Sequence, residues 1–227
     1  MIKPQINPAD IQHWVFDLDN TLYHHSFNLF QQVEKLMTKF IMEKWNMDIN
    51  SAKHLQKKYF IKYGTTLRGL MENDNIDPIE FLNKIHEIDY SLLPRNDKLA
   101  SDLQNISGQK YIFTNANQNH TIAILNQLGI KQTIFAKMIF IEDIDYIPKP
   151  NIPAYEKFFS HCQQIQKQNS VLIDDIADNL KTAKHFGMKT VWLKNTSYPH
   201  NPAPHPLPDY IDMAIDNIDD FVADMIR

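Results

Sequence analysis

The chain has 227 residues, which is long enough for one domain with a sizeable insertion. Hydrophobic residues make up 43% and charged residues 22%, so the composition is that of a folded soluble protein and excludes an intrinsically disordered one. The formal net charge of −4 provides no basic field for a nucleic acid or an anionic membrane surface. We therefore expect neither a nucleic-acid partner nor a membrane partner.

Several common classes of protein and site are excluded by simple features of the sequence. The first residues lack the apolar core of a secretory signal, and no run approaches the ~20 apolar residues of a membrane span, so we expect a cytoplasmic protein. One cysteine, Cys162, cannot form an internal disulfide. The five glycines include no Rossmann triplet, and the Gly64 to Gly69 stretch lacks the Lys and Ser/Thr of a P-loop. The sequence does not predict the oligomeric state.

The pattern of residues 1–92 predicts one strand followed by helices. Residues 13–16 form a short apolar run, which is typical of a strand buried on both faces. Between residues 27 and 90 the apolar residues recur at steps of three and four, which predicts helices, with Asn50 or Ser51 as the cap of the second. We therefore predict an all-helical cap domain at residues 24–92, inserted into a core formed by residues 1–23 and 93–227.

Beyond residue 93 the pattern predicts strands that alternate with helices. Such alternation is typical of βαβ units, so the predicted fold is α/β, a Rossmann-like doubly wound parallel sheet with the helical cap inserted. Residues 200–208 contain four prolines and predict a surface connection. The predicted strands are 110–113, 138–141, 171–173, 190–192 and a weak one at 211–215; the predicted helices are 119–128, 153–166, 179–186 and 219–226.

Polar side chains follow four of the predicted strands. Ligands bind at the carboxyl ends of the strands in an open parallel sheet, so we expect these side chains to converge on one edge. In chain order they are Asp17 and Asp19, then Thr114 and Asn115, then Lys149, then Asp174 and Asp175. Each set alone is an ordinary turn, cap or surface residue. Their combination in this order, each after a strand-like run, predicts a functional site.

The four aspartates of this set predict a magnesium site. Asp17 and Asp19 are two residues apart on an extended segment and point to the same side. Together with Asp174 and Asp175 they would repel one another unless a cation lies among them or some are protonated. Oxygen ligands select a hard ion, and Mg²⁺ suits a site that a substrate phosphate completes.

Three further residues are predicted to bind the phosphate. Thr114, with the backbone amides around it that include Asn115, can donate hydrogen bonds to phosphate oxygens. Lys149 supplies positive charge, and the flanking prolines are expected to hold it in an extended backbone.

With these four sets of residues the sequence resembles the haloacid dehalogenase-like hydrolase superfamily. The motifs that carry the resemblance are Phe16-Asp17-Leu18-Asp19-Asn20-Thr21-Leu22-Tyr23, Phe113-Thr114-Asn115-Ala116, Lys149-Pro150 and Ile173-Asp174-Asp175-Ile176-Ala177-Asp178-Asn179. Tyr63-Gly64 with Gly69-Leu70, and Thr114-Asn115-Ala116 followed by His120, look like the pyrimidine 5′-nucleotidase branch. Two positions differ from the usual family pattern, His24 after the first motif and Ile176 after the paired acids.

The resemblance implies a phosphatase that works through an aspartyl phosphate. Asp17 is implied as the nucleophile and Asp19 as the general acid and base. Mg²⁺ is implied to be held by Asp17, by the backbone carbonyl of Asp19 and by Asp175, while Asp174 or Asn179 is left open as a further contact. Dehalogenases of the superfamily lack the acid two residues after the nucleophile, so Asp19 favours phosphoester chemistry.

The choice of substrate is expected to come from the cap, because the sheet edge contacts only the phosphate. Tyr63 can stack on a base and Arg68 can meet a carbonyl or a second charge, so both are candidate substrate contacts. The predicted substrate is a small phosphorylated metabolite, a pyrimidine nucleoside 5′-monophosphate first. The alternatives are a phosphatase or phosphomutase acting on a sugar phosphate and, from another class, a non-hydrolytic sensor that keeps its phosphoaspartate.

Overall fold

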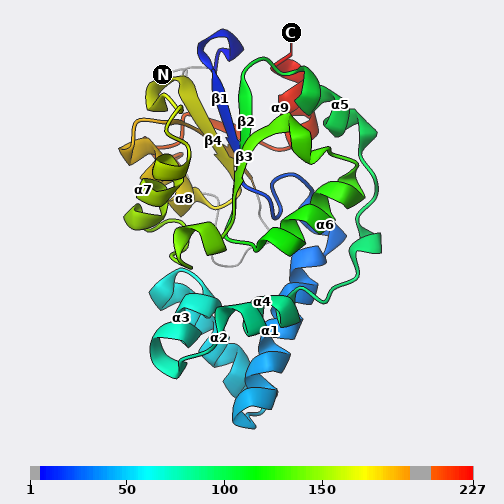
Figure 1. Ribbon diagram of the computed structural model, residues 1–227, viewed down its shortest axis with the longest axis vertical. Coiled ribbons are helices and arrows are strands. Elements are labelled where there is room, and N and C mark those ends of the chain that lie inside the picture. Colours follow the sequence, from blue (N-terminus) through cyan, green and yellow to red (C-terminus); the bar gives the residue numbers. More distant parts are fainter. Residues whose placement is uncertain (1–5, 195–205, 227) are drawn as a thin grey trace.

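The computed structural model of the protein describes residues 6–194 and 206–226 (Figure 1). Its centre is a six-stranded sheet with the order β3-β2-β1-β4-β5-β6, in which every neighbouring pair is parallel. This confirms the predicted doubly wound α/β fold. The strands are β1 His13–Phe16, β2 Gln109–Phe113, β3 Phe135–Ile139, β4 Ser170–Asp174, β5 Lys189–Leu193 and β6 Met213–Ile215.

Helices cover both faces of the sheet because successive strand residues point to opposite sides. Trp14 and Phe16 of β1 pack into one apolar cluster with residues of α5, α6 and α9, whereas Val15 packs into the other with α7 and α8. Figure 1 shows these two groups of helices on either side of the strands. The helices are α5 Asp97–Asn105, α6 Gln118–Leu128, α7 Ile152–His161, α8 Ala177–His185 and α9 Ile218–Asp224.

Residues 24–92 contain helices and no strand, as predicted, and they form a separate layer beyond one end of the sheet (Figure 1). The cap of α2 is Asp48, whose carboxylate accepts the backbone N–H groups of Asn50 and Ser51, so the predicted caps at these two positions are wrong. The α-helices of this helical insertion are α1 Leu29–Trp45, α2 Ile49–Tyr63, α3 Thr66–Asp74 and α4 Pro78–Ile85.

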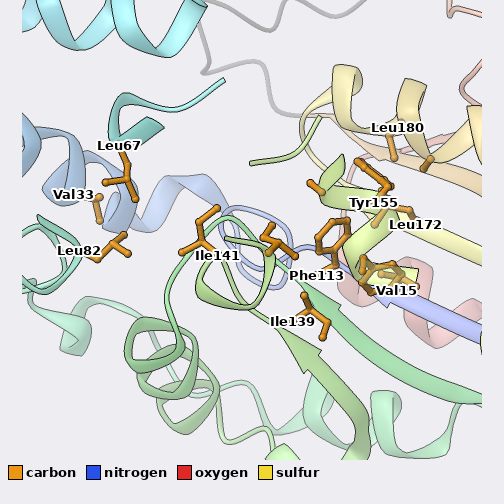
Figure 2. Packing of buried hydrophobic residues seen from close by; sticks show 14 of the residues in the cluster. Val15, Val33, Leu67, Leu82, Phe113, Ile139, Ile141, Tyr155, Leu172 and Leu180 are labelled. Atoms are coloured by element: carbon orange, nitrogen blue, oxygen red, sulfur yellow. The ribbon is translucent and has the colours of Figure 1, made fainter. Parts of the chain in front are cut away.

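The helical insertion and the sheet share one apolar cluster. Figure 2 shows Val33, Leu67 and Leu82 of the insertion at one end of this cluster and Val15 and Leu172 of the sheet at the other, with Ile141 between them. Removing this apolar surface from water contributes roughly 25 cal/mol per Å². The insertion is therefore packed onto the core and not merely tethered to it.

Two predicted boundaries are wrong for the same reason. The apolar run 138–141 predicts a strand, but β3 spans Phe135–Ile139. Ile141 lies in the loop after β3, where its backbone N–H donates to the carbonyl of Ala116 in the loop after β2. Helix α7 ends at His161 although an apolar residue recurs at Ile165, which is buried after a turn. In both places a loop residue is buried, so the apolar pattern extends past the element.

The strand order places the functional edge beside β1. Phe16 of β1 pairs with Ile112 of β2 and Ile173 of β4, so the residues that follow these three strands lie next to one another. From β1 the strand order continues to β2 and β3 on one side and to β4, β5 and β6 on the other. The carboxyl end of β1 is therefore the switch point at which open α/β sheets bind ligands. Among the described residues no helix has the length and apolar character that crossing a membrane requires. Residues 200–205 of the predicted proline-rich connection lie outside the described residues.

Candidate active site

Asp17 lies directly after β1, at the centre of the functional edge. Its backbone N–H donates to the carbonyl of Ile173, 2.9 Å away, which continues the pairing of β1 with β4 by one residue. Its side chain is nearly buried, and each carboxylate oxygen has a donor: Lys149 Nζ lies 2.8 Å from Oδ1 and Thr21 Oγ1 lies 3.0 Å from Oδ2. The carboxylate is therefore held in one orientation.

Lys149 reaches the same point from the loop before α7. Its Nζ donates to Asp17 Oδ1 at 2.8 Å, to Asp174 Oδ2 at 2.7 Å and to the carbonyl of Phe113 at 2.8 Å, so all three ammonium protons are used. The residue is only 1% exposed. Residues 148–151 form a turn closed by the N–H of Asn151 on the carbonyl of Pro148, and the peptide between Lys149 and Pro150 is cis.

Asp174 and Asp175 complete the acidic cluster from the end of β4. One oxygen each of Asp17, Asp174 and Asp175 lie within 4.8 Å of one another, and all three residues are buried. Asp174 is enclosed by donors, because it accepts from Lys149, from the side-chain amide of Asn179 and from the backbone N–H of Ile176. The cluster offers hard oxygen ligands in the spacing that a divalent ion requires, so these residues fit Mg²⁺.

Burial and crowded charge shift the pKa values of the two central groups. Burial raises the pKa of Asp17 to about 7; Lys149 opposes this effect, while the neighbouring carboxylates of Asp174 and Asp19 add to it. Burial lowers the pKa of Lys149, but its ion pairs with Asp17 and Asp174 outweigh burial and leave that pKa above its usual value. Lys149 is therefore protonated. Its single positive charge is smaller than the combined negative charge of the three carboxylates when they are ionised.

Asp19 points into a different environment from Asp17. Its Oδ1 accepts the hydroxyl proton of Tyr23 at 2.6 Å and lies 2.8 Å from Nε2 of His120. Burial alone raises the pKa of Asp19, but the contacts with His120 and Tyr23 together outweigh it and lower the pKa. The side chain of Asp19 therefore stands apart from the three clustered carboxylates.

The loop after β2 brings Thr114 and Asn115 to the edge. Thr114 is buried, and its hydroxyl accepts the backbone N–H of Ala116 at 3.0 Å, which leaves the hydroxyl proton available to an incoming oxygen. The Asn115 amide pairs with the backbone of Lys149, accepting from its N–H at 2.8 Å and donating to its carbonyl at 3.2 Å. In this structure the Asn115 side chain therefore positions the Lys149 turn.

The two predicted substrate contacts of the helical insertion are engaged with side chains of α3. The hydroxyl of Tyr63 donates to Asn73 at 3.1 Å, and Arg68 forms an ion pair with Glu72. Gly64, the neighbour of Tyr63, lies against the core. A Cβ at Gly64 would be 3.3 Å from Pro148, so the end of α2 lies directly on the turn that carries Lys149.

Sequence reasoning missed several residues around the predicted site. Thr21 holds Asp17 and Tyr23 holds Asp19, each four residues from its aspartate, so turn chemistry was the available signal; Asn179, left open above as a contact at the metal site, donates to Asp174. Tyr90 contacts His120 from 30 positions away, and no local signal indicates such a pairing.

Comparison with solved structures shows the same fold. CbbY from Rhodobacter sphaeroides, solved in complex with phosphate, is 12% identical with a TM-score of 0.65, and the match covers 93% of this chain and 96% of that one. YfnB from Bacillus subtilis, solved bound to magnesium, is 17% identical with a TM-score of 0.57 and coverage of 95% and 98%. L-2-haloacid dehalogenases share the fold as well.

Sequence comparison identifies the family. Phosphate metabolism protein 8 from Saccharomyces cerevisiae is 29% identical over 192 residues, which cover 76% of this chain and 58% of the yeast protein. The chain thus spans less than two thirds of the length of that relative. The family model described as haloacid dehalogenase-like hydrolase matches residues 14–193, which extend from β1 to the end of β5. The chain belongs to the haloacid dehalogenase-like hydrolase family.

Proposed function

We propose that the protein is a Mg²⁺-dependent phosphomonoester hydrolase that works through an aspartyl-phosphate intermediate. The observation that carries this proposal is the buried arrangement in which Asp17, Asp174 and Asp175 surround one point and Lys149 bridges two of them. Asp19 stands beside Asp17 with its own set of donors. A nucleophile, a general acid and a charge centre are thereby held at one sheet edge.

In the first step the Asp17 carboxylate attacks phosphorus and the bond to the ester oxygen breaks. The departing oxygen takes its proton from the Asp19 carboxyl group, so an alcohol leaves and an aspartyl phosphate remains. Asp17 loses its negative charge as the new bond forms. Lys149 then exchanges its contact with Asp17 for the transferred phosphoryl group, while its ion pair with Asp174 keeps it in place.

In the second step water attacks phosphorus and Asp19, now a carboxylate, takes the proton of that water. The bond between phosphorus and Asp17 breaks, which releases inorganic phosphate and restores the Asp17 carboxylate and the Asp19 acid. The hydroxyl of Thr114, whose oxygen already accepts the N–H of Ala116, donates to a phosphate oxygen in both steps.

The carboxylates divide into ligands of the ion and partners of Lys149. Each oxygen of Asp174 accepts two hydrogen bonds, from Ile176 and Asn179 at Oδ1 and from Lys149 and Asn179 at Oδ2, whereas each oxygen of Asp17 accepts only one, so the role of Asp174 is to hold Lys149. We therefore assign the ion to Asp17 and Asp175, and the family resemblance adds the backbone carbonyl of Asp19. Bound Mg²⁺ supplies positive charge that neutralises the phosphate oxygens and the crowded carboxylates.

The fold alone does not separate a phosphatase from a dehalogenase, since both occur on it. Cleavage of a carbon–halogen bond expels a halide ion, which needs no proton, whereas an alkoxide leaving group does. Asp19, held by Tyr23 and His120 within reach of the nucleophile's loop, therefore favours the phosphoester reaction. The same acid favours hydrolysis over a sensor, because it hastens the loss of the phosphoryl group.

We further propose residues 24–92 as a cap and residues 1–23 and 93–227 as the catalytic core. The contact of Gly64 with the Lys149 turn supports this division, because it places the end of α2 over the phosphate site. A pyrimidine nucleoside 5′-monophosphate is the first candidate substrate, with Tyr63 and Arg68 as candidate contacts once they leave Asn73 and Glu72. A sugar phosphate is the second candidate, for hydrolysis or for phosphomutase chemistry.

A phosphate-release screen over several dozen phosphorylated metabolites, with Mg²⁺ or with a chelator, tests the proposal. Wild-type protein is expected to release phosphate only with Mg²⁺, and Asp17→Asn is expected to lose the activity while Asp220→Asn, at an exposed carboxylate of α9, keeps it. Activity that persists in Asp17→Asn contradicts the mechanism. Equal rates on sugars and nucleotides contradict only the nucleotide assignment.

A further inference from the structure

His120 contacts the proposed general acid although the catalytic steps above assign it no part. It lies in the first turn of α6, is 1% exposed, and places Nε2 2.8 Å from Asp19 Oδ1. The same Asp19 oxygen accepts the hydroxyl proton of Tyr23 at 2.6 Å. Among the described residues, the hydrogen bonds of the Asp19 carboxyl thus end on one oxygen, Oδ1.

Two donors on Oδ1 decide which oxygen of Asp19 carries the transferable proton. A proton on Oδ1 would compete with the Tyr23 hydroxyl and with the imidazole N–H for the same lone pairs, so the proton belongs on Oδ2. The two bonds also fix the rotation of the carboxyl group. Oδ2 therefore points in one direction, as proton transfer to a leaving oxygen requires.

His120 is itself held by two residues of the segment that returns from the helical insertion to α5. The hydroxyl of Tyr90 lies 3.0 Å from His120 Nδ1 and 3.2 Å from the carbonyl of His86. The ring of His86, directly after α4, stacks on the ring of His120 with centroids 4.2 Å apart and an interplanar angle of 24°. Figure 1 shows this segment leaving α4 and passing α6 on its way to α5.

We propose that His120 is a positioning residue that orients Asp19 for proton transfer to the leaving oxygen, and that His86 and Tyr90 hold His120 in that position. The inference rests on the proposed phosphatase function and assigns a role within the same site. Its consequence is that the acid–base step depends on the segment that joins the helical insertion to the core, and not only on the sheet edge.

The proton balance follows from the donors and acceptors. When Asp19 is a carboxylate it can only accept, so His120 Nε2 carries the hydrogen and donates it. In the neutral ring Nδ1 is an acceptor, and the single hydroxyl proton of Tyr90 serves either this nitrogen or the carbonyl of His86 at any one time. The ring exchanges no proton with substrate: Asp19 Oδ2 gives its proton to the departing alcohol and regains one from the attacking water.

The dependence of rate on the leaving group tests this role. An alkyl alcohol needs a proton as it departs, whereas p-nitrophenolate leaves readily without one. We therefore compare kcat/KM, which reports the steps up to transfer to Asp17, for p-nitrophenyl phosphate and for the fastest alkyl phosphate of the screen. His120→Leu is expected to lower kcat/KM about 100-fold on the alkyl ester and less than about 5-fold on the nitrophenyl ester.

Conservative variants separate positioning from a general loss of structure. His120→Gln places an amide N–H near the position of Nε2 and is expected to stay within about 5-fold of the wild-type kcat/KM on both esters. Tyr90→Phe removes the hydroxyl that contacts His120 Nδ1 and is expected to lose about 5-fold on the alkyl ester alone. Near-UV circular dichroism and Tm establish that each variant is folded.

Several outcomes overturn the inference. Equal losses of His120→Leu on the two esters, or no loss on the alkyl ester, show that His120 does not orient the acid. If His120→Leu does not fold, Tyr23→Phe replaces it, because it removes the other donor from the same oxygen; equal losses of Tyr23→Phe on both esters then refute the role. A wild-type protein that releases phosphate from neither ester refutes the proposed function itself, which is a different result.

Discussion

Replacing Asp17 with asparagine should stabilise the metal-free protein at alkaline pH although it abolishes turnover. Burial and the neighbouring carboxylates raise the pKa of Asp17 from its usual 3.8 to about 7. The unfolded chain therefore releases this proton at lower pH than the folded protein does. As pH rises from about 4 to about 7, ionisation favours the unfolded state, and the free energy of unfolding falls.

The size of the effect follows from the same values. At pH 8 the ionised Asp17 costs the folded protein about 4 kcal/mol relative to the unfolded chain, and at pH 4 the cost is below about 1 kcal/mol. Asparagine keeps an oxygen for Lys149 and can donate to the oxygen of Thr21, so the polar contacts of the site can be kept. Because local relaxation reduces such costs, we expect a gain of about 2 kcal/mol at pH 8.

Urea unfolding of the wild type and of Asp17→Asn at pH 4 and pH 8, with a chelator or with excess Mg²⁺, measures the effect. The variant should be more stable than the wild type only at pH 8 with the chelator, because Mg²⁺ stabilises the ionised wild-type site by binding to it. Asp220→Asn controls for the loss of one surface charge. A variant that is less stable than the wild type in the chelator at pH 8 refutes the crowding of charge that underlies the metal site.

Three further predictions follow from other contacts. Lys149→Gln leaves Asp17 and Asp174 without their shared cation, so the free energy of unfolding at pH 8 should fall by about 3 kcal/mol in urea titrations with a chelator, and by less with Mg²⁺. Gly64→Ala strains a residue at φ +85° and places a methyl group against Pro148. The matched control is Gly187→Ala, which has the same strain at φ +89° but open space around the new methyl group. The value of kcat/KM should fall in Gly64→Ala alone. Burial, helped by the neighbouring His120, lowers the pKa of His86 to about 3, so its contribution to the free energy of unfolding is complete above pH 6.5 and is lost towards pH 3. In urea titrations the free energy of unfolding should therefore fall between pH 6.5 and pH 4.5 by about 2 kcal/mol less in His86→Phe than in the wild type.

The sheet edge could be predicted because each of its residues follows a strand that is recognisable from its own sequence. Residues 13–16 are all buried, so the apolar run coincides with the strand, and Asp17 follows directly. Strand β3 could not be placed from its sequence, because Ala136 and Lys137 within it are exposed while Phe140 after it is buried. The convergence on β1 then needed only the rule that parallel strands end at one edge.

The contact of Asp19 with His120 and Tyr90 behind it could not be predicted, because these residues are remote from Asp19 in the sequence. His120 lies 101 positions after Asp19 and Tyr90 lies 30 positions before His120. A histidine in the first turn of a helix carries no sign of its partner. Only the packing of the returning segment against α6 brings these groups together. The nucleophile was thus predictable from local sequence, whereas the means of orienting the acid depended on tertiary structure.

Two carboxyl groups two residues apart are placed in opposite electrostatic environments, and this bears on when the reaction can begin. In the protein alone burial and crowding raise the pKa of Asp17, and the donors around Asp19 lower its pKa, whereas the first chemical step needs Asp17 ionised and Asp19 protonated. A divalent cation beside Asp17 favours its carboxylate, and a phosphate dianion near Asp19 favours its acid form. The two ligands of the reaction therefore each shift one carboxyl group towards the state that catalysis requires. It follows that binding of the ion and of the substrate together increases the fraction of the protein in which the nucleophile and the acid are both in the required state.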